Sequence, residues 1–314
     1  MEQKYEKWPG YSYNLPENHP VVSLMYLVLL MIVGTTLLSV ISIFFGLSLY
    51  GADILSRLDD IMAGNDPAGV NFLKIIQTSS SVGMFVLPPL LLAYIERRRT
   101  RYFNFKPLKR PLLWIFTILI ILAASPMLEL VGKINEKMQL PVFLDGLEKW
   151  MKAKELELEK VTKVLLTTKS YGGLFFNLFM IAVVPAIGEE LVFRGVLQNA
   201  LTRWTKNVPL AIWLTAIIFS AIHVQFYGFL PRMLLGALFG YLLLWSGSIW
   251  LPMLAHFINN GSVVVYAFIL LHQGKSLDKL DDMPVNWYYY PVSAVVVCYL
   301  LFRFWKECGK LKDG

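Results

Sequence analysis

Long stretches without a charged residue alternate with short polar segments along the whole chain. The long stretches that contain no Asp, Glu, Lys or Arg include residues 21–52, 75–95, 111–128, 170–188, 233–274 and 283–302. A helix needs about 20 mostly apolar residues to cross the roughly 30 Å hydrocarbon core of a bilayer. Only helices and closed barrels satisfy their backbone groups there, and long runs without polar alternation are not barrel strands. The pattern therefore predicts an all-α, polytopic membrane protein.

We expect about eight transmembrane helices in a single domain that covers residues 1–314. Turn-forming residues, such as Ser246-Gly247-Ser248 and Pro252, divide the longest apolar run. The predicted parts are N-terminal spans at 21–129, an amphipathic extracytoplasmic loop at 130–172, a core at 173–271 and a last span at 287–305. The individual spans are expected at 21–50, 75–95, 111–129, 173–188, 209–223, 229–245, 252–271 and 287–305.

The composition excludes a soluble domain. The chain is 56% hydrophobic and only 16% charged, whereas soluble domains carry about 25% charged residues. The first apolar run begins after some 20 residues and is longer than the apolar core of a cleaved signal peptide, so we interpret it as a membrane helix. The two cysteines, Cys298 and Cys308, indicate neither a disulfide framework nor a zinc motif.

The basic residues predict how the chain is oriented in the membrane. Seven of them lie between positions 97 and 110, directly after the second span. The positive-inside rule places this loop in the cytoplasm. Counting spans from it puts both termini in the cytoplasm, in the plasma (inner) membrane, and the 130–172 loop outside. The net charge of +7 is therefore interpreted as topology and lipid contact, and no nucleic-acid partner is expected.

The long outer loop contains a segment with near-helical apolar spacing. Leu147, Met151, Leu158, Val161 and Leu165 recur within residues 147–169. We favour an amphipathic helix that lies on the membrane face, since periodicity alone reports burial. The functional alternative is a lid or a substrate-gripping element.

Polar residues within the apolar segments are the candidates for chemistry, because an ionisable group in a membrane is costly. Glu190 and Arg194 are four residues apart and share one helix face, so the arginine can hold this carboxylate. Glu189 is rotated by about 100° and points elsewhere. One paired and one free carboxylate are typical of a site in which one group orients and the other reacts. The alternative is a capped helix end with a salt bridge.

Two further segments carry polar residues at membrane depth. His223 follows an apolar stretch, and His256 and Asn260 are four residues apart on another helix. Each could simply form an interhelical hydrogen bond. Together with the carboxylates, however, they predict one cavity formed by the spans of the C-terminal half.

These residues form the motifs E-E-x-x-x-R at 189–194, F-x-x-x-H at 219–223 and H-x-x-x-N at 256–260. The set resembles the CPBP family of bacterial CAAX-protease and bacteriocin-processing (Abi) proteins, which are related to the eukaryotic CAAX prenyl endopeptidase. The resemblance implies an intramembrane endopeptidase. It further implies that Glu189 activates the attacking water, that Arg194 holds Glu190, and that His223 positions the water or a metal ion. His256 and Asn260 would complete the site, as ligands or as an oxyanion hole.

The resemblance leaves the cofactor open. A divalent metal such as zinc could be held by Glu189, His223 and His256, or the glutamate could activate water alone. The implied substrate is a peptide or protein with a hydrophobic or lipidated end, cleaved near the membrane surface beside membrane lipid. From the span count we expect the cavity to open towards the cytoplasm.

Two other functions fit the sequence less well. A non-catalytic bacteriocin-immunity or membrane interaction protein would have no reason to keep costly polar groups in the membrane. A transporter would favour repeated, interrupted spans, and the chain has no internal repeat. The signatures of other intramembrane proteases, including G-x-S-x-G and H-E-x-x-H, are absent.

Overall fold

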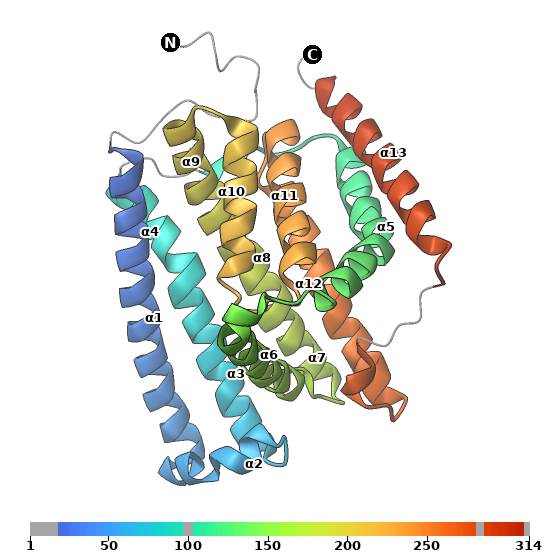
Figure 1. Ribbon diagram of the computed structural model, residues 1–314. Coiled ribbons are helices and arrows are strands. Elements are labelled where there is room, and N and C mark those ends of the chain that lie inside the picture. The colour runs from blue at the N-terminus through green and yellow to red at the C-terminus, as the bar shows by residue number, and fades with distance from the viewer. Residues whose placement is uncertain (1–17, 97–102, 281–285, 311–314) are drawn as a thin grey trace.

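The computed structural model describes residues 18–96, 103–280 and 286–310, and this part of the chain contains helices and no β-strand (Figure 1). The all-α fold is therefore confirmed. The α-helices are α1 (Pro20–Tyr50), α2 (Leu58–Met62), α3 (Pro67–Ser81), α4 (Leu87–Ile95), α5 (Pro111–Glu136), α6 (Asp145–Leu166), α7 (Tyr171–Asn177), α8 (Val184–Glu190), α9 (Gln198–Thr205), α10 (Val208–Ala221), α11 (Phe229–Ser246), α12 (Trp250–His272) and α13 (Tyr289–Gly309). Short 3₁₀ segments are η2 (Ala52–Arg57), η5 (Val142–Leu144) and η8 (Leu277–Leu280), and π-helical segments are η3 (Val82–Val86), η6 (Leu178–Val183) and η7 (Leu191–Leu197).

Within the described residues, six helices are long and apolar enough to cross a bilayer, and each coincides with a predicted span. They are Pro20–Tyr50, Pro67–Ile95, Pro111–Glu136, Tyr171–Thr205, Phe229–Ser246 and Trp250–His272. The shorter apolar helix α10 occupies a seventh predicted span, and α13 covers the eighth segment without being one of the six. The chain is thus an integral membrane bundle.

The fourth span is much longer than its predicted range of 173–188. Helix α7, η6, α8, η7 and α9 follow one another without a break, so that the helix runs for 35 residues, from Tyr171 to Thr205. The charged residues at 189–194 led us to end the span there. They do not end it, because Glu190 and Arg194 pair with each other inside the bundle, as described below.

The two flanks of the bundle enclose a central group of helices. α1 buries only Ser23, Leu27, Ser42 and Gly46, and a helix that is apolar on all sides faces lipid or protein. α13 packs on α5 at the other flank. Between them, α8, α10, α11 and α12 form the centre, where the motif residues lie (Figure 1).

A glycine allows a second helix to approach the motif directly. A Cβ at Gly188 would lie 2.7 Å from the Cβ of Phe85 and 3.0 Å from its backbone carbonyl carbon. Real Cβ atoms do not come so close, so only glycine fits here. η3 therefore packs on α8 one residue before the two carboxylates.

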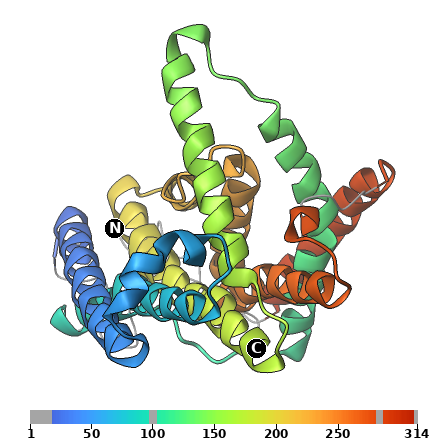
Figure 2. The same cartoon turned by 90° about the horizontal axis from the view of Figure 1, so that it is seen from below.

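The first turn of α1 and the last turn of α13 lie on the same face of the bundle, and α6 lies towards the opposite face (Figure 1). Seen from below, α6 runs across that face (Figure 2). The predicted amphipathic helix is confirmed, and it is tied to the protein: Glu155 accepts a hydrogen bond from the backbone N–H of Tyr227 at 3.2 Å, and Lys163 pairs with Asp278 at 2.6 Å. The topology prediction used the basic loop at 97–110, and residues 97–102 of this loop lie outside the described residues. The basic residues Lys4, Lys7 and Lys312 near the termini lie outside them as well.

Candidate active site

Two adjacent carboxylates lie near the middle of the long helix 171–205, at the end of α8. Glu189 is 9% exposed, and Glu190 and Arg194 are 0% exposed. The π-helical segment η7 begins directly after Glu190 and contains Arg194. Such π-turns are rare within α-helices and frequently occur at functional sites.

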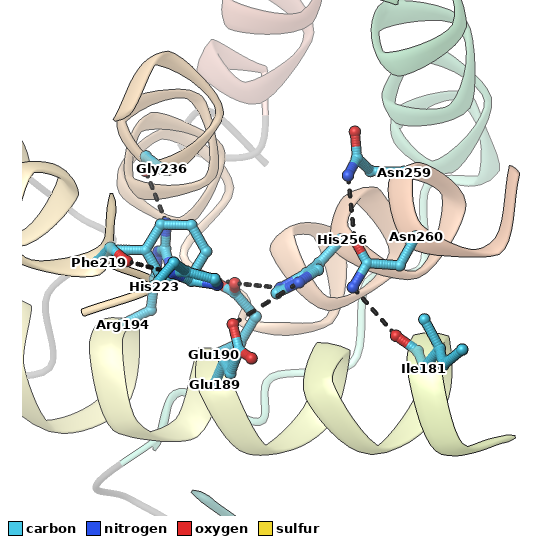
Figure 3. Close-up of polar contacts among 10 residues, drawn as sticks. All are labelled: Ile181, Glu189, Glu190, Arg194, Phe219, His223, Gly236, His256, Asn259 and Asn260. Carbon is cyan, nitrogen blue, oxygen red and sulfur yellow. Dashed lines mark hydrogen bonds and ion pairs between the residues drawn. The ribbon is translucent and has the colours of Figure 1, made fainter. Parts of the chain in front are cut away.

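Arg194 holds Glu190, as its position in the sequence predicts. Its Nη1 lies 3.1 Å from Oε1 of Glu190, and its Nη2 donates to the carbonyl oxygen of Gly236 at 2.7 Å (Figure 3). The guanidinium also lies against two aromatic rings, 4.9 Å from the centroid of Phe219 and 5.3 Å from that of Phe239. The buried cation is therefore fixed by a carboxylate, a carbonyl and two π-systems.

His256 contacts both carboxylates, but unequally. Its Nδ1 lies 2.9 Å from Oε1 of Glu190, and its Nε2 lies 3.9 Å from Oε2 of Glu189. The ring stacks on Phe239 at 5.3 Å and meets the edge of Phe219 at 6.0 Å. Because Glu190 is ion-paired to Arg194, it is a carboxylate that accepts a hydrogen bond from Nδ1–H. The lone pair of a neutral imidazole is then on Nε2, which faces Glu189.

His223 lies just beyond the end of α10. Its Nδ1 is 2.8 Å from the carbonyl oxygen of Phe219, and since a carbonyl can only accept, Nδ1 carries the proton. The Nε2 of the neutral ring is therefore an acceptor. Val224 follows with φ 54°, which is costly for a β-branched residue and marks a sharp turn of the chain next to the site.

Asn260 and its neighbour Asn259 are linked. Asn260 donates from Nδ2 to the carbonyl oxygen of Ile181 at 3.1 Å, and its Oδ1 accepts from Nδ2 of Asn259 at 3.0 Å (Figure 3). Ile181 lies in η6. Each amide nitrogen thus keeps a second N–H, and both side chains line the cavity described next.

A cavity of about 260 Å³ brings most of the predicted residues together. It is lined by Glu189, Phe219, His223, Gly228, Pro231, Arg232, Leu235, Phe239, His256, Asn259 and Asn260. Glu190 and Arg194 lie behind it, buried and paired with each other, and Glu190 also contacts His256. Sequence reasoning assigned no role to Asn259 or Arg232. Arg232 interrupts an apolar segment, so the cost of a charge in the membrane was the signal that could have identified it.

The cavity adjoins a larger one, which we call the vestibule, with a volume of about 740 Å³. Gly228 lines both. The vestibule walls come from α5, α6, α12 and the 222–228 turn, and they include Ser125, Glu136, Glu155, Glu159, Thr162, Lys163, Gln225, Tyr227, Ser262 and Tyr266. Because α6 lies away from the face on which α1 begins and α13 ends (Figure 1), the site opens opposite to the direction expected from the span count. The span count used only the order of the helices, and it could not show that α6 and the 222–228 turn wall the space next to the polar residues.

The charged groups of α6 at the vestibule respond differently to their surroundings. Burial raises the pKa of Glu155, although the Tyr227 N–H and the nearby Arg232 act against it. The hydrogen bonds that Lys163 donates to Asp278 and Glu159 raise its pKa. The wall of the vestibule is acidic on balance, with Glu136, Glu155 and Glu159 against Lys163.

The donor set for a metal ion was tested against this geometry. Within the described residues, no three side chains of His, Cys, Asp or Glu lie close enough together to hold an ion. Glu189, His223 and His256 line one cavity. Nδ1 of each imidazole is engaged by Phe219 or Glu190, so only Nε2 of each ring is free to bind an ion. The three predicted ligands are thus not gathered into a preformed metal site, and no chemical step is assigned to a metal below.

Comparison with known proteins shows what this core is similar to. The family described as "Type II CAAX prenyl endopeptidase Rce1-like" matches residues 171–262. The uncharacterized protein YpbD of Bacillus subtilis (strain 168) is 28% identical over 138 residues, which are 43% of this chain and 65% of that protein. The chain thus spans slightly less than two thirds of the length of this curated relative. No solved structure matches the chain.

The matched segment contains Glu189, Glu190, Arg194, His223, His256 and Asn260, and it includes all the residues that line the cavity. Residues 171–262 of this membrane protein are therefore similar to the Rce1-like type II CAAX prenyl endopeptidases, as the resemblance of the motifs indicated.

Proposed function

We propose that this chain is an intramembrane endopeptidase of the CAAX-protease type that hydrolyses a peptide bond with a water molecule activated by Glu189. The family match supports a membrane protease. The observation that carries the proposal is the pair of acceptors Glu189 Oε2 and His256 Nε2, 3.9 Å apart at the cavity wall. Glu189 Oε2 is buried and has no hydrogen-bond partner among the described residues.

Two acceptors at this separation are too far apart for a direct hydrogen bond and close enough for one water molecule to reach both. A water there donates one hydrogen bond to Glu189 and a second to His256. Its lone pairs are then free to attack a carbonyl carbon that enters the cavity. Glu190 and Arg194 keep the imidazole in the tautomer that accepts at Nε2, so their role is to position His256.

The reaction follows from these positions. The water oxygen forms a bond to the carbonyl carbon while Glu189 takes one of its protons, and the carbonyl oxygen becomes an oxyanion. The second N–H of Asn259 or Asn260 donates to this oxyanion. Glu189 then returns the proton to the amide nitrogen, the C–N bond breaks, and a carboxylic acid and an amine leave.

Single variants of the two carboxylates test the proposal. Purified full-length protein is incubated with a panel of fluorogenic peptides, together with Glu189→Gln and Glu190→Gln. Glu189→Gln keeps the shape and removes the base, so turnover should fall by about 10²–10⁴ while the thermal unfolding temperature is preserved. Full activity of Glu189→Gln with a dead Glu190→Gln would reverse the two roles. If both variants match the wild type, the non-catalytic immunity or interaction protein becomes the better description.

The proposed reaction uses no metal ion, because the cavity side chains form no cluster of ligands. Treatment with a chelator should therefore leave turnover unchanged within about two-fold, given that each step above needs only proton transfer and hydrogen bonding. Loss of activity that added zinc restores would assign Glu189, His223 and His256 to a metal site that forms only on binding.

We further propose that the termini are cytoplasmic and that substrates reach the vestibule from the extracytoplasmic face. The basic loop at 97–110 supports this orientation. The substrate would be a peptide or protein with a hydrophobic or lipidated end, held beside membrane lipid. Cysteines placed at Lys106 and Lys149, in a background without Cys298 and Cys308, should react with an impermeant reagent from inside and outside respectively. Labelling of position 106 from outside alone would invert the orientation.

A further inference from the structure

Arg232 places a second guanidinium at the active-site cavity, and the proposed hydrolysis does not use it. It is the fourth residue of α11 and lines the cavity together with Glu189 and His256. Gly228, four residues earlier, lines both the cavity and the vestibule. Arg232 therefore lies at the passage between the two.

Its hydrogen bonds are incomplete. Nη2 of Arg232 donates to Oε1 of Gln225 at 2.6 Å. Nη1 is buried and has no hydrogen-bond partner in the part of the chain that the structure describes. No carboxylate of that part lies within ion-pair distance of Arg232 either, in contrast to Arg194, which is bonded to Glu190. A buried cationic N–H without an acceptor is costly, so its retention calls for a partner that arrives from elsewhere.

The local chain holds the guanidinium in place. Gln225 bonds one nitrogen, and a Cβ at Gly228 would lie only 3.2 Å from Nη2 and 3.5 Å from Nη1. Glycine at this position leaves the space that the guanidinium occupies. Arg232 is thus preorganised, which reduces the entropy lost when a ligand binds.

We infer that Arg232 binds a carboxylate of the peptide substrate at the passage and thereby determines specificity. This inference rests on the proposed function. The planar fork of an arginine matches a carboxylate. The acidic groups Glu136, Glu155 and Glu159 on the vestibule wall repel an anionic group from the remaining surface. The carboxylate comes either from the free C-terminus of the peptide or from an acidic side chain.

Peptide binding tests the inference without requiring cleavage. The probes are dye-labelled octapeptide mixtures with randomised apolar residues, in three forms: a free C-terminal acid, a C-terminal amide, and an amide with one glutamate. Their affinities are measured by fluorescence anisotropy for Glu189→Gln and for the double variant Glu189→Gln/Arg232→Gln. We expect Arg232→Gln to weaken the carboxylate-bearing peptides by about 10–100-fold, as the loss of a charged hydrogen bond requires, and to leave the plain amide unchanged. The form that responds identifies the source of the carboxylate.

Further variants control for misfolding. Gln225→Ala and Gly228→Ala keep the charge and displace the guanidinium, so each should reduce the same preference partially, and Arg232→Lys should restore part of it. Arg303→Gln, on the exposed surface of α13, should change nothing. The inference is wrong if the plain amide binds as well as the two carboxylate forms, if the preference survives Arg232→Gln, or if no form binds. A wild-type protein that binds acids through Arg232 but cleaves none would instead refute the proposed hydrolysis.

Discussion

Arg194–Glu190 in the active site and Lys149–Asp145 on α6 are both ion pairs four residues apart on a helix. The buried pair has a separation of 3.1 Å with both side chains 0% exposed, and the surface pair is shorter, at 2.7 Å, with side chains 75% and 58% exposed. Judged by distance alone, the surface pair would be expected to stabilise the protein more than the buried pair. Water reverses the order, because it screens the exposed charges and already solvates each of them, whereas a buried charge that loses its partner has nothing to replace it.

The two regions also differ in what else holds the charges. On α6, Lys152 pairs with Glu148, and Lys154 with Glu157, so that each pair is one of several similar ones along an exposed helix. Around Arg194, a carboxylate, a carbonyl and two aromatic rings converge on one cation. The active site therefore concentrates its stability and its chemistry in the same few contacts.

Removal of the buried cation should have the largest effect. Arg194→Ala leaves Glu190 unpaired in the protein interior, which should cost about 3–5 kcal/mol of unfolding free energy, and it should also abolish turnover because His256 loses its orientation. Thermal unfolding of the purified protein in detergent measures the loss. The matched control is Lys149→Ala, which breaks the exposed pair of the same spacing and should change stability by less than about 1 kcal/mol. Equal effects of the two variants would invalidate the comparison.

The aromatic support of the site should come next in size. The ring of Phe239 is stacked on His256 and lies 5.3 Å from the guanidinium carbon of Arg194. Phe239→Leu keeps an apolar side chain and removes the π-face, so we expect a loss of about 1–3 kcal/mol together with reduced turnover. Both are measured as above. A variant that is less active but equally stable would assign the ring to catalysis alone.

The smallest effect on stability should come from a substitution in the vestibule, Glu155→Gln. It should be a gain of stability rather than a loss. Burial raises the pKa of Glu155 above its usual value of 4.5, so the folded protein favours the protonated form, and this contribution to stability is lost as the pH rises through the raised pKa. Glu155→Gln keeps an acceptor for the Tyr227 N–H and carries no charge. Its unfolding temperature should therefore exceed that of the wild type at neutral pH, and the difference should vanish in acid, below the usual pKa.

A pH series of thermal unfolding curves for the two proteins decides this point. If Glu155→Gln is less stable at neutral pH, the attraction between Glu155 and Arg232 outweighs the desolvation of the carboxylate. That outcome would also weaken the inference that Arg232 binds a carboxylate of the substrate, since Glu155 would then act as its partner.

Local spacing in the sequence was enough to predict much of this molecule. The charge-free runs located the helices that are long and apolar enough to span a membrane, because the bilayer dictates both length and composition. The Glu190–Arg194 pair followed from a separation of four residues on a helix. The amphipathic α6 followed from its periodicity. Each of these depends on residues close together in the chain.

Only the tertiary structure decided how distant residues meet. His256 hydrogen-bonds Glu190 rather than Glu189, a choice made by the packing of α12 on α8 and not by any spacing. The fourth helix continues to Thr205 because Glu190 and Arg194 pair with each other inside the bundle. Arg232 reaches the cavity, and α6 forms a wall of the adjoining vestibule. Apolar patterns report that a residue is buried but not against what, since burial lowers the free energy equally for many arrangements.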